Sequence, residues 1–181
     1  MLHQPFPIVG IGASAGGVEA LEVLFQDPPP DSGMAFVLVT HLPVGYETSL
    51  PDILGRHSAM AVTIAGNGEA IEPNHVYVCP SGSTLTVKEG RLVLSPLGSA
   101  PIPNLVDALL YSLAEDRGEQ AIGVVLSGCE SAYHLIPNRL PTVTLVRCPI
   151  NSSTQCVAVR GLGSDLHADR ASDPRPNNNP S

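Results

Sequence analysis

The sequence has no tryptophan and few other aromatic residues, with 4 tyrosines and 3 phenylalanines among 181 residues. An interior built from it must therefore be mainly aliphatic. No apolar run approaches the roughly eighteen residues of a membrane-spanning helix, and the N-terminus lacks the basic start and apolar stretch of a signal peptide. We therefore expect a cytoplasmic protein, without a membrane span, that is long enough to bury one core.

Basic residues are also scarce. The 9 lysines and arginines face 17 acidic residues, for a net charge of −8, which argues against a nucleic-acid surface. The 4 cysteines form no C-x-x-C pair, and their spacing with His134 matches no familiar zinc site. We expect reduced cysteines and neither a metal nor a cofactor.

Small residues dominate one stretch near the N-terminus. An apolar strand predicted over 6–11 leads into Gly12-Ala13-Ser14-Ala15-Gly16, which matches the nucleophile elbow that exposes a serine hydroxyl between a strand and a helix. The stretch from Gly10 to Ala15 also satisfies the dinucleotide fingerprint G-x-G-x-x-A. That alternative requires an acidic residue at the end of the next strand, where the chain has His41. A tightly packed turn without chemistry is the third interpretation.

Hydrophobic periodicity predicts alternating strands and helices. We expect helices over 17–26, 49–56 and 104–117, strands over 6–11, 35–40, 60–65, 75–79 and 121–126, and a hairpin of 84–88 with 91–95. Asn104 is a candidate N-cap with Asp107 three residues later, and Gly118 ends that helix. The pattern predicts an open α/β sheet with an antiparallel hairpin attached.

Ser14 and His41 would then lie at the carboxyl ends of two adjacent parallel strands, the edge where such sheets bind ligands. A serine hydroxyl needs a base to become a nucleophile, and a neutral imidazole can supply it. The histidine follows the serine by only 27 positions. In α/β-hydrolases the histidine comes last in the triad, so this is a different fold.

Four motifs resemble the catalytic domain of CheB, the chemotaxis protein-glutamate methylesterase, as it occurs at the start of CheB/CheR fusion proteins. They are VGIGASAGGVEAL, VTHLP, HVYVCPSG and SLAEDRGEQAIGVVLSG, and they lie within residues 6–128. The resemblance implies a doubly wound, mostly parallel sheet and a Ser-His-Asp triad containing Ser14 and His41. It also implies hydrolysis of glutamate γ-methyl esters on chemoreceptors, with glutamine deamidation as a related activity.

The chain departs from the family where the third triad member should stand. Leu126-Ser127-Gly128 begins the family motif L-[ST]-G-x-G-x-D-G, but Ala132 occupies the position of the aspartate. Glu130 and Asp165 are candidate substitutes. Loss of the equivalent aspartate in a serine protease costs on the order of 10⁴ in kcat, so we expect impaired activity. The alternative is an inactive module that binds a receptor or a CheR-type methyltransferase.

The composition also changes after residue 128. Residues 1–128, the CheB-like domain, hold 4 basic and 13 acidic side chains, whereas the divergent segment 129–181 holds 5 and 4. We expect this segment to be irregular, apart from two short strands over 142–146 and 156–159, and 163–181 has the composition of disorder. A shifted reading frame would explain the change. An exposed sheet edge would then follow the strand over 121–126.

Overall fold

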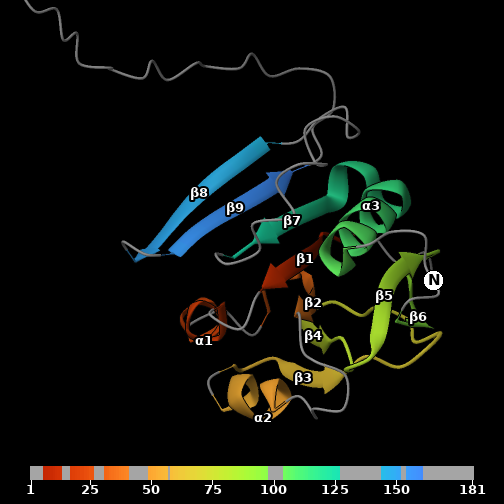
Figure 1. The fold of residues 1–181 in the computed structure, drawn as a ribbon, viewed down its shortest axis with the longest axis horizontal. Coiled ribbons are helices and arrows are strands. Elements are labelled where there is room, and N and C mark those ends of the chain that lie inside the picture. The colour runs from red at the N-terminus through yellow and green to blue at the C-terminus, as the bar shows by residue number, and fades with distance from the viewer. Residues whose placement is uncertain are drawn as a thin grey trace, which may run out of the picture.

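The structure, a computed structural model, describes residues 6–13, 17–26, 31–40, 49–56, 58–97, 104–126, 144–151 and 154–160. Its centre is a seven-stranded sheet in the order β3-β4-β2-β1-β7-β9-β8 (Figure 1). The parallel part comprises β1 (Ile8–Ala13), β2 (Ala35–Thr40), β3 (Ala61–Ile64), β4 (His75–Val78) and β7 (Ala121–Val125). All five predicted strands are present, and β1 and β2 are the parallel neighbours that the sequence predicts.

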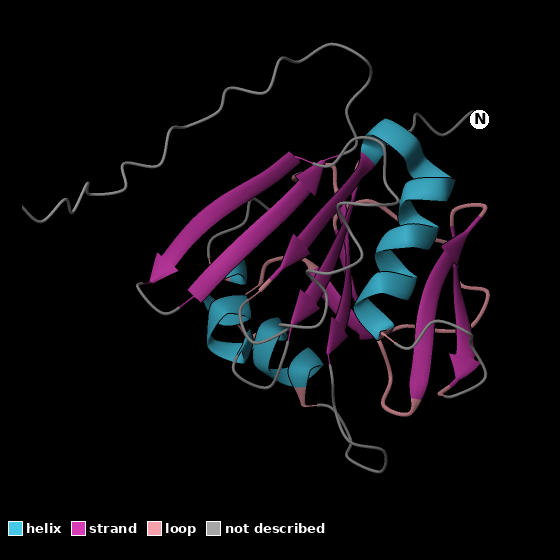
Figure 2. Ribbon diagram, turned by 45° about the horizontal axis from the view of Figure 1, so that its top comes forward, coloured by secondary structure: helices cyan, strands magenta, loops and turns pink. Residues whose placement is uncertain are grey.

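Helices cover both faces of this sheet. The short helices α1 (Val18–Phe25) and α2 (Leu50–Gly55) lie on one face. The longer helix α3 (Leu105–Arg117) lies on the other, beside the hairpin of β5 (Ser83–Lys88) and β6 (Arg91–Pro96) (Figures 1 and 2). The doubly wound α/β fold with an attached hairpin is therefore confirmed.

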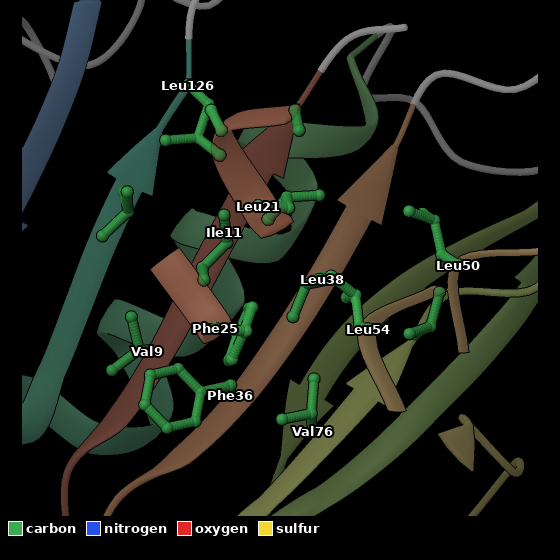
Figure 3. Packing of buried hydrophobic residues seen from close by; sticks show 14 of the residues in the cluster. Val9, Ile11, Leu21, Phe25, Phe36, Leu38, Leu50, Leu54, Val76 and Leu126 are labelled. Carbon is green, nitrogen blue, oxygen red and sulfur yellow. The ribbon is translucent and has the colours of Figure 1, made fainter. Parts of the chain in front are cut away.

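The core under α1 and α2 is mainly aliphatic, as the scarcity of aromatic residues predicts. Leu21 and Phe25 of α1 and Leu50 and Leu54 of α2 are buried against alternate residues of the strands (Figure 3). The Phe25 ring meets the ring of Phe36 edge to face, with centroids 5.3 Å apart. This packing holds the strands in register up to their carboxyl ends.

On the opposite face, α3 approaches β1 closely because β1 has glycines where the helix crosses it. A Cβ atom on Gly12 would lie 2.4 Å from Cγ1 of Val106, and one on Gly10 would lie 3.0 Å from Cδ2 of Leu113. The N-cap prediction is confirmed, since the Asn104 side chain accepts a 3.0 Å hydrogen bond from the backbone N–H of Val106. Gly118 ends the helix with a φ of 53°.

The hairpin is tied to α3 by hydrogen bonds from its backbone. The N–H of Val87 donates to Oγ of Ser112 over 3.0 Å, and the N–H of Gly90 donates to Oδ2 of Asp116 over 3.1 Å. The turn has positive φ angles at Glu89 and Gly90, as a two-residue hairpin turn requires. These contacts fix α3 between the hairpin and the sheet.

The divergent segment extends the sheet. The two stretches predicted as short strands form β8 (Thr144–Asn151) and β9 (Thr154–Arg160), which are longer than expected. β9 pairs antiparallel with β7, from Ile122 with Arg160 to Val125 with Val157. The expectation of an exposed edge at β7 is therefore wrong, because an antiparallel strand from a distant part of the chain covers it.

No helix in the described part of the chain is long and apolar enough to cross a membrane. Residues 163–181, which we expect to be disordered from their composition, lie outside the described residues.

Candidate active site

Three parallel strands end together at one edge of the sheet. In the register of β1 with β2, Ala13 is the partner of Thr40, the last residue of β2. In the register of β1 with β7, Gly12 is the partner of Val125, the last residue of β7. The backbone N–H of Leu126 continues this ladder and donates to the Gly12 carbonyl over 2.8 Å. The carboxyl ends of β1, β2 and β7 thus form a single edge.

The candidate catalytic residues follow these strand ends directly in the chain. Ser14 comes after Ala13 and His41 after Thr40, so the residues that precede the two candidates are partners in the sheet. Ser14 and His41 themselves lie outside the described residues, as do Glu130, Ala132 and Asp165. The structure aligns the strands that lead to the serine and the histidine.

Packing on both sides explains why small residues surround the serine in the sequence. A Cβ atom on Gly17, just before α1, would lie 2.9 Å from Cβ of Ala13. Gly12 is equally constrained on the other face, where it meets Val106 of α3. Glycine is therefore required for packing at Gly12, the first glycine of G-x-S-x-G, and at Gly17, the residue that follows the motif.

Two buried polar groups near this edge have no hydrogen-bond partner among the described residues. One is the Oγ1 atom of Thr40, on the residue that precedes His41, and the other is the carboxyl group of Asp107 in the first turn of α3. Asp107 is 1% exposed, and burial raises the pKa of its carboxyl above the ordinary value. The sequence pattern indicates only that Asp107 belongs to a helix cap, and it gives no signal for the burial of this residue.

Cys79 is the one cysteine whose side chain the structure describes, and its thiol is unreactive. Cys79 follows β4, and its thiol lies 3.4 Å from the carbonyl oxygen of Ser83. Burial raises the pKa of this thiol to about 12, so it stays protonated at neutral pH and cannot act as a nucleophile. No cluster of three metal-binding side chains occurs among the residues with described side chains. Cys129, Cys148 and Cys156 have no described side chain.

Comparison with known proteins identifies the family. The family model for the CheB methylesterase matches residues 9–132. This match covers more than half of the chain and includes the strands that form the edge. The chain belongs to the CheB methylesterase family. The match ends at Ala132.

Curated relatives of the chain support its membership of this family. The chain is 40% identical over 126 residues to a protein-glutamate methylesterase/protein-glutamine glutaminase of Xanthomonas campestris, covering 67% of this chain and 35% of that protein. It is 36% identical over 137 residues to the corresponding protein of Bordetella parapertussis, covering 70% and 39%. The chain thus spans little more than a third of the curated relatives it matches.

The fold is also that of a solved member of the family. The CheB methylesterase catalytic domain of Thermotoga maritima superposes with a TM-score of 0.58 and 30% sequence identity, over 67% of each chain. The mostly parallel sheet with its attached hairpin is therefore the CheB catalytic fold.

Proposed function

We propose that the chain is a protein-glutamate methylesterase, with Ser14 as the nucleophile and His41 as its base. The observation that supports this most strongly is the register of Ala13 with Thr40, which brings the two strands that precede these residues to one edge. Membership in the CheB family supplies the substrate class, the γ-methyl esters of glutamate on chemoreceptors. The proposal places the protein in the cytoplasm, where it would meet such receptors and a CheR-type methyltransferase.

The reaction begins with the serine. Oγ of Ser14 attacks the ester carbonyl carbon, and the imidazole of His41 accepts the hydroxyl proton. When the C–O bond to the methoxy group breaks, the imidazolium returns this proton to the leaving group, and methanol departs. The product of this half-reaction is an acyl-enzyme between Ser14 and the glutamate side chain.

Water completes the cycle. His41 removes a proton from a water molecule, which attacks the acyl-enzyme and releases the glutamate carboxylate and the free serine. With glutamine as substrate, the leaving group of the first step is ammonia. Both steps create an imidazolium that a triad aspartate would stabilise. Since Ala132 stands at that position, we infer that turnover is impaired.

Ala132 at the expected position of the aspartate also favours a second candidate function. A CheB-like module without its aspartate could bind a receptor or a CheR-type partner without hydrolysing anything. Retention of both Ser14 and His41 in the sequence argues for the enzyme, because a binding module has no need for this pair.

Methanol release from a methylated receptor fragment tests the proposal. We expect slow release by the purified chain and none by the variant Ser14→Ala. Ser95→Ala in β6, in the hairpin and outside the three strands that end at the edge, is the matched control and should release methanol at the wild-type rate.

Two results would count against the enzyme. Equal release by the wild type and Ser14→Ala would remove Ser14 as the nucleophile. If a folded sample bound the receptor stably but released no methanol, the function would be receptor binding without hydrolysis.

A further inference from the structure

Asp107 is the one acidic side chain that is buried among the residues whose exposure the structure describes. It lies in the first turn of α3, and neither of its carboxyl oxygens has a hydrogen-bond partner in the part of the chain that the structure describes. Buried polar groups are nearly always paired, so an unpaired carboxyl needs an explanation. A hydrophobic residue of the same size would fill this position at lower cost.

The position of Asp107 on α3 places it near the edge that carries the candidate catalytic residues. Its neighbour Val106 packs on Gly12, two residues before Ser14. Leu109 packs toward β2 and the hairpin. Since successive helix residues are turned by about 100°, Asp107 faces away from Leu109, toward the side of β7. The chain leaving β7 is the one that carries the triad aspartate in the family and Ala132 here.

No other charge in the described structure acts on this carboxyl. The strands β1 and β7 have no ionisable residue, and Tyr111 is the titratable side chain one turn further along the same face of α3. On the hairpin, Lys88 lies beside the turn, near the opposite end of α3. Burial alone raises the pKa of Asp107, without a contribution from a neighbouring charge. A cation that forms nearby during the reaction would therefore favour the ionised form of this carboxyl group.

We propose that Asp107 supplies the negative charge that stabilises the imidazolium of His41, in place of the family aspartate that is missing at Ala132. This inference rests on the proposed function. Asp107 is a positioning residue, because it acts on the histidine and not on the substrate. A direct hydrogen bond is not required, since the interior of the protein screens charges weakly. At an effective dielectric constant of about 20, a charge about 10 Å away shifts a pKa by about one unit.

Labelling of the full chain with a serine-directed fluorophosphonate tests the role of Asp107. In this reaction the Ser14 Oγ–P bond forms, fluoride leaves, and the hydroxyl proton passes to His41. The labelling rate therefore rises as His41 loses its proton, and the midpoint of its pH profile reports the pKa of His41. We expect Asp107→Asn to move this midpoint about one pH unit lower and to slow labelling at its plateau about tenfold.

Matched variants separate this effect from a change in folding. Glu115→Gln removes an exposed charge from the same helix and should leave both the midpoint and the rate unchanged. Asp107→Leu removes the carboxyl by a different substitution and should reproduce the shift, which covers the case in which Asp107→Asn fails to fold. Circular dichroism establishes that each sample is folded.

The outcomes distinguish this inference from the proposed function. If the wild type is labelled at Ser14 and both Asp107 variants keep the wild-type midpoint, Asp107 is only a structural residue and the inference is overturned, while the esterase assignment stands. If the folded wild type is not labelled at Ser14, the esterase assignment fails and the role of Asp107 fails with it.

Discussion

Burial changes the chemistry of single residues in this protein, and Cys79 shows the simplest case. Because burial raises the pKa of its thiol to about 12, almost none of it is thiolate at pH 8. We expect the peptide containing Cys79 to resist iodoacetamide at this pH in the native protein and to react fully after unfolding. Mass spectrometry of the digested protein measures both. Rapid alkylation in the native state would mean that the loop after β4 opens readily.

Burial of Asp107 makes stability depend on pH in the direction opposite to that of a salt-bridged aspartate. Its pKa is higher in the folded than in the unfolded chain, so the folded state holds the proton more tightly. The contribution of Asp107 to stability is therefore fully present below the unfolded pKa of about 3.9 and is lost as pH rises through the folded pKa.

The variant Asp107→Leu tests this dependence. We expect it to be more stable than the wild type at pH 7 by about 1–3 kcal/mol, the cost of an unsatisfied buried polar group, and to show a smaller advantage at pH 4. Urea denaturation at the two pH values measures the difference, with Glu115→Gln as the control. A less stable variant at pH 7 would mean that the carboxylate has a stabilising partner.

At the scale of elements, the contact between α3 and β1 depends on Gly12. Alanine there would place its Cβ 2.4 Å from Cγ1 of Val106, and a β-branched side chain has little freedom to move away. We expect Gly12→Ala to destabilise the protein by about 1–3 kcal/mol, as overpacking of a core does. The added substitution Val106→Ala should restore part of this loss, since it removes the clashing methyl groups.

Thermal unfolding of these variants measures the effect. The control is Gly55→Ala in α2, where a Cβ would meet nothing within 4 Å and the change should be neutral or slightly stabilising. A stability of Gly12→Ala equal to that of the wild type would show that α3 can shift without cost.

Most elements of the fold are predictable from the sequence because their signals are local. Apolar runs give the parallel strands, Glu89-Gly90 gives the hairpin turn, and Asn104 with Gly118 bounds α3. The burial of Asp107 is not predictable in this way, because an acidic residue in a first helical turn normally faces solvent near the helix dipole. The pairing of β9 with β7 depends on contacts between distant parts of the chain, so it has no local signal.

The candidate site is predictable to a similar extent. The apolar pattern predicts that β1 and β2 are parallel neighbours. Their carboxyl ends, which precede Ser14 and His41 in the chain, are therefore expected at the same edge of the sheet. No motif in the sequence predicts a third catalytic group, because Ala132 stands where the resemblance to the family leads us to expect an aspartate. Only the packing of α3 on Gly12 points to an acidic side chain at this edge.

At the scale of the whole molecule, the sheet joins two parts of different character. Five parallel strands belong to the region that matches the CheB family, whereas β8 and β9 come from the segment beyond the match. β9 occupies the backbone hydrogen-bonding edge of β7, next to the strand that leads to Ser14. An unpaired edge at this place would offer a template for association with another chain.

Truncation after Gly128 tests how much β8 and β9 contribute. The shortened chain would lose the strand that pairs with β7 from Ile122 to Val125, and we expect lower thermal stability and aggregation during concentration. A chain truncated after Arg160 keeps both strands and is the control. Light scattering and thermal unfolding of the two chains give the comparison. If the shorter chain proved as soluble and as stable as the control, the five parallel strands and their helices would suffice for folding, and the pairing of β9 would contribute nothing to it.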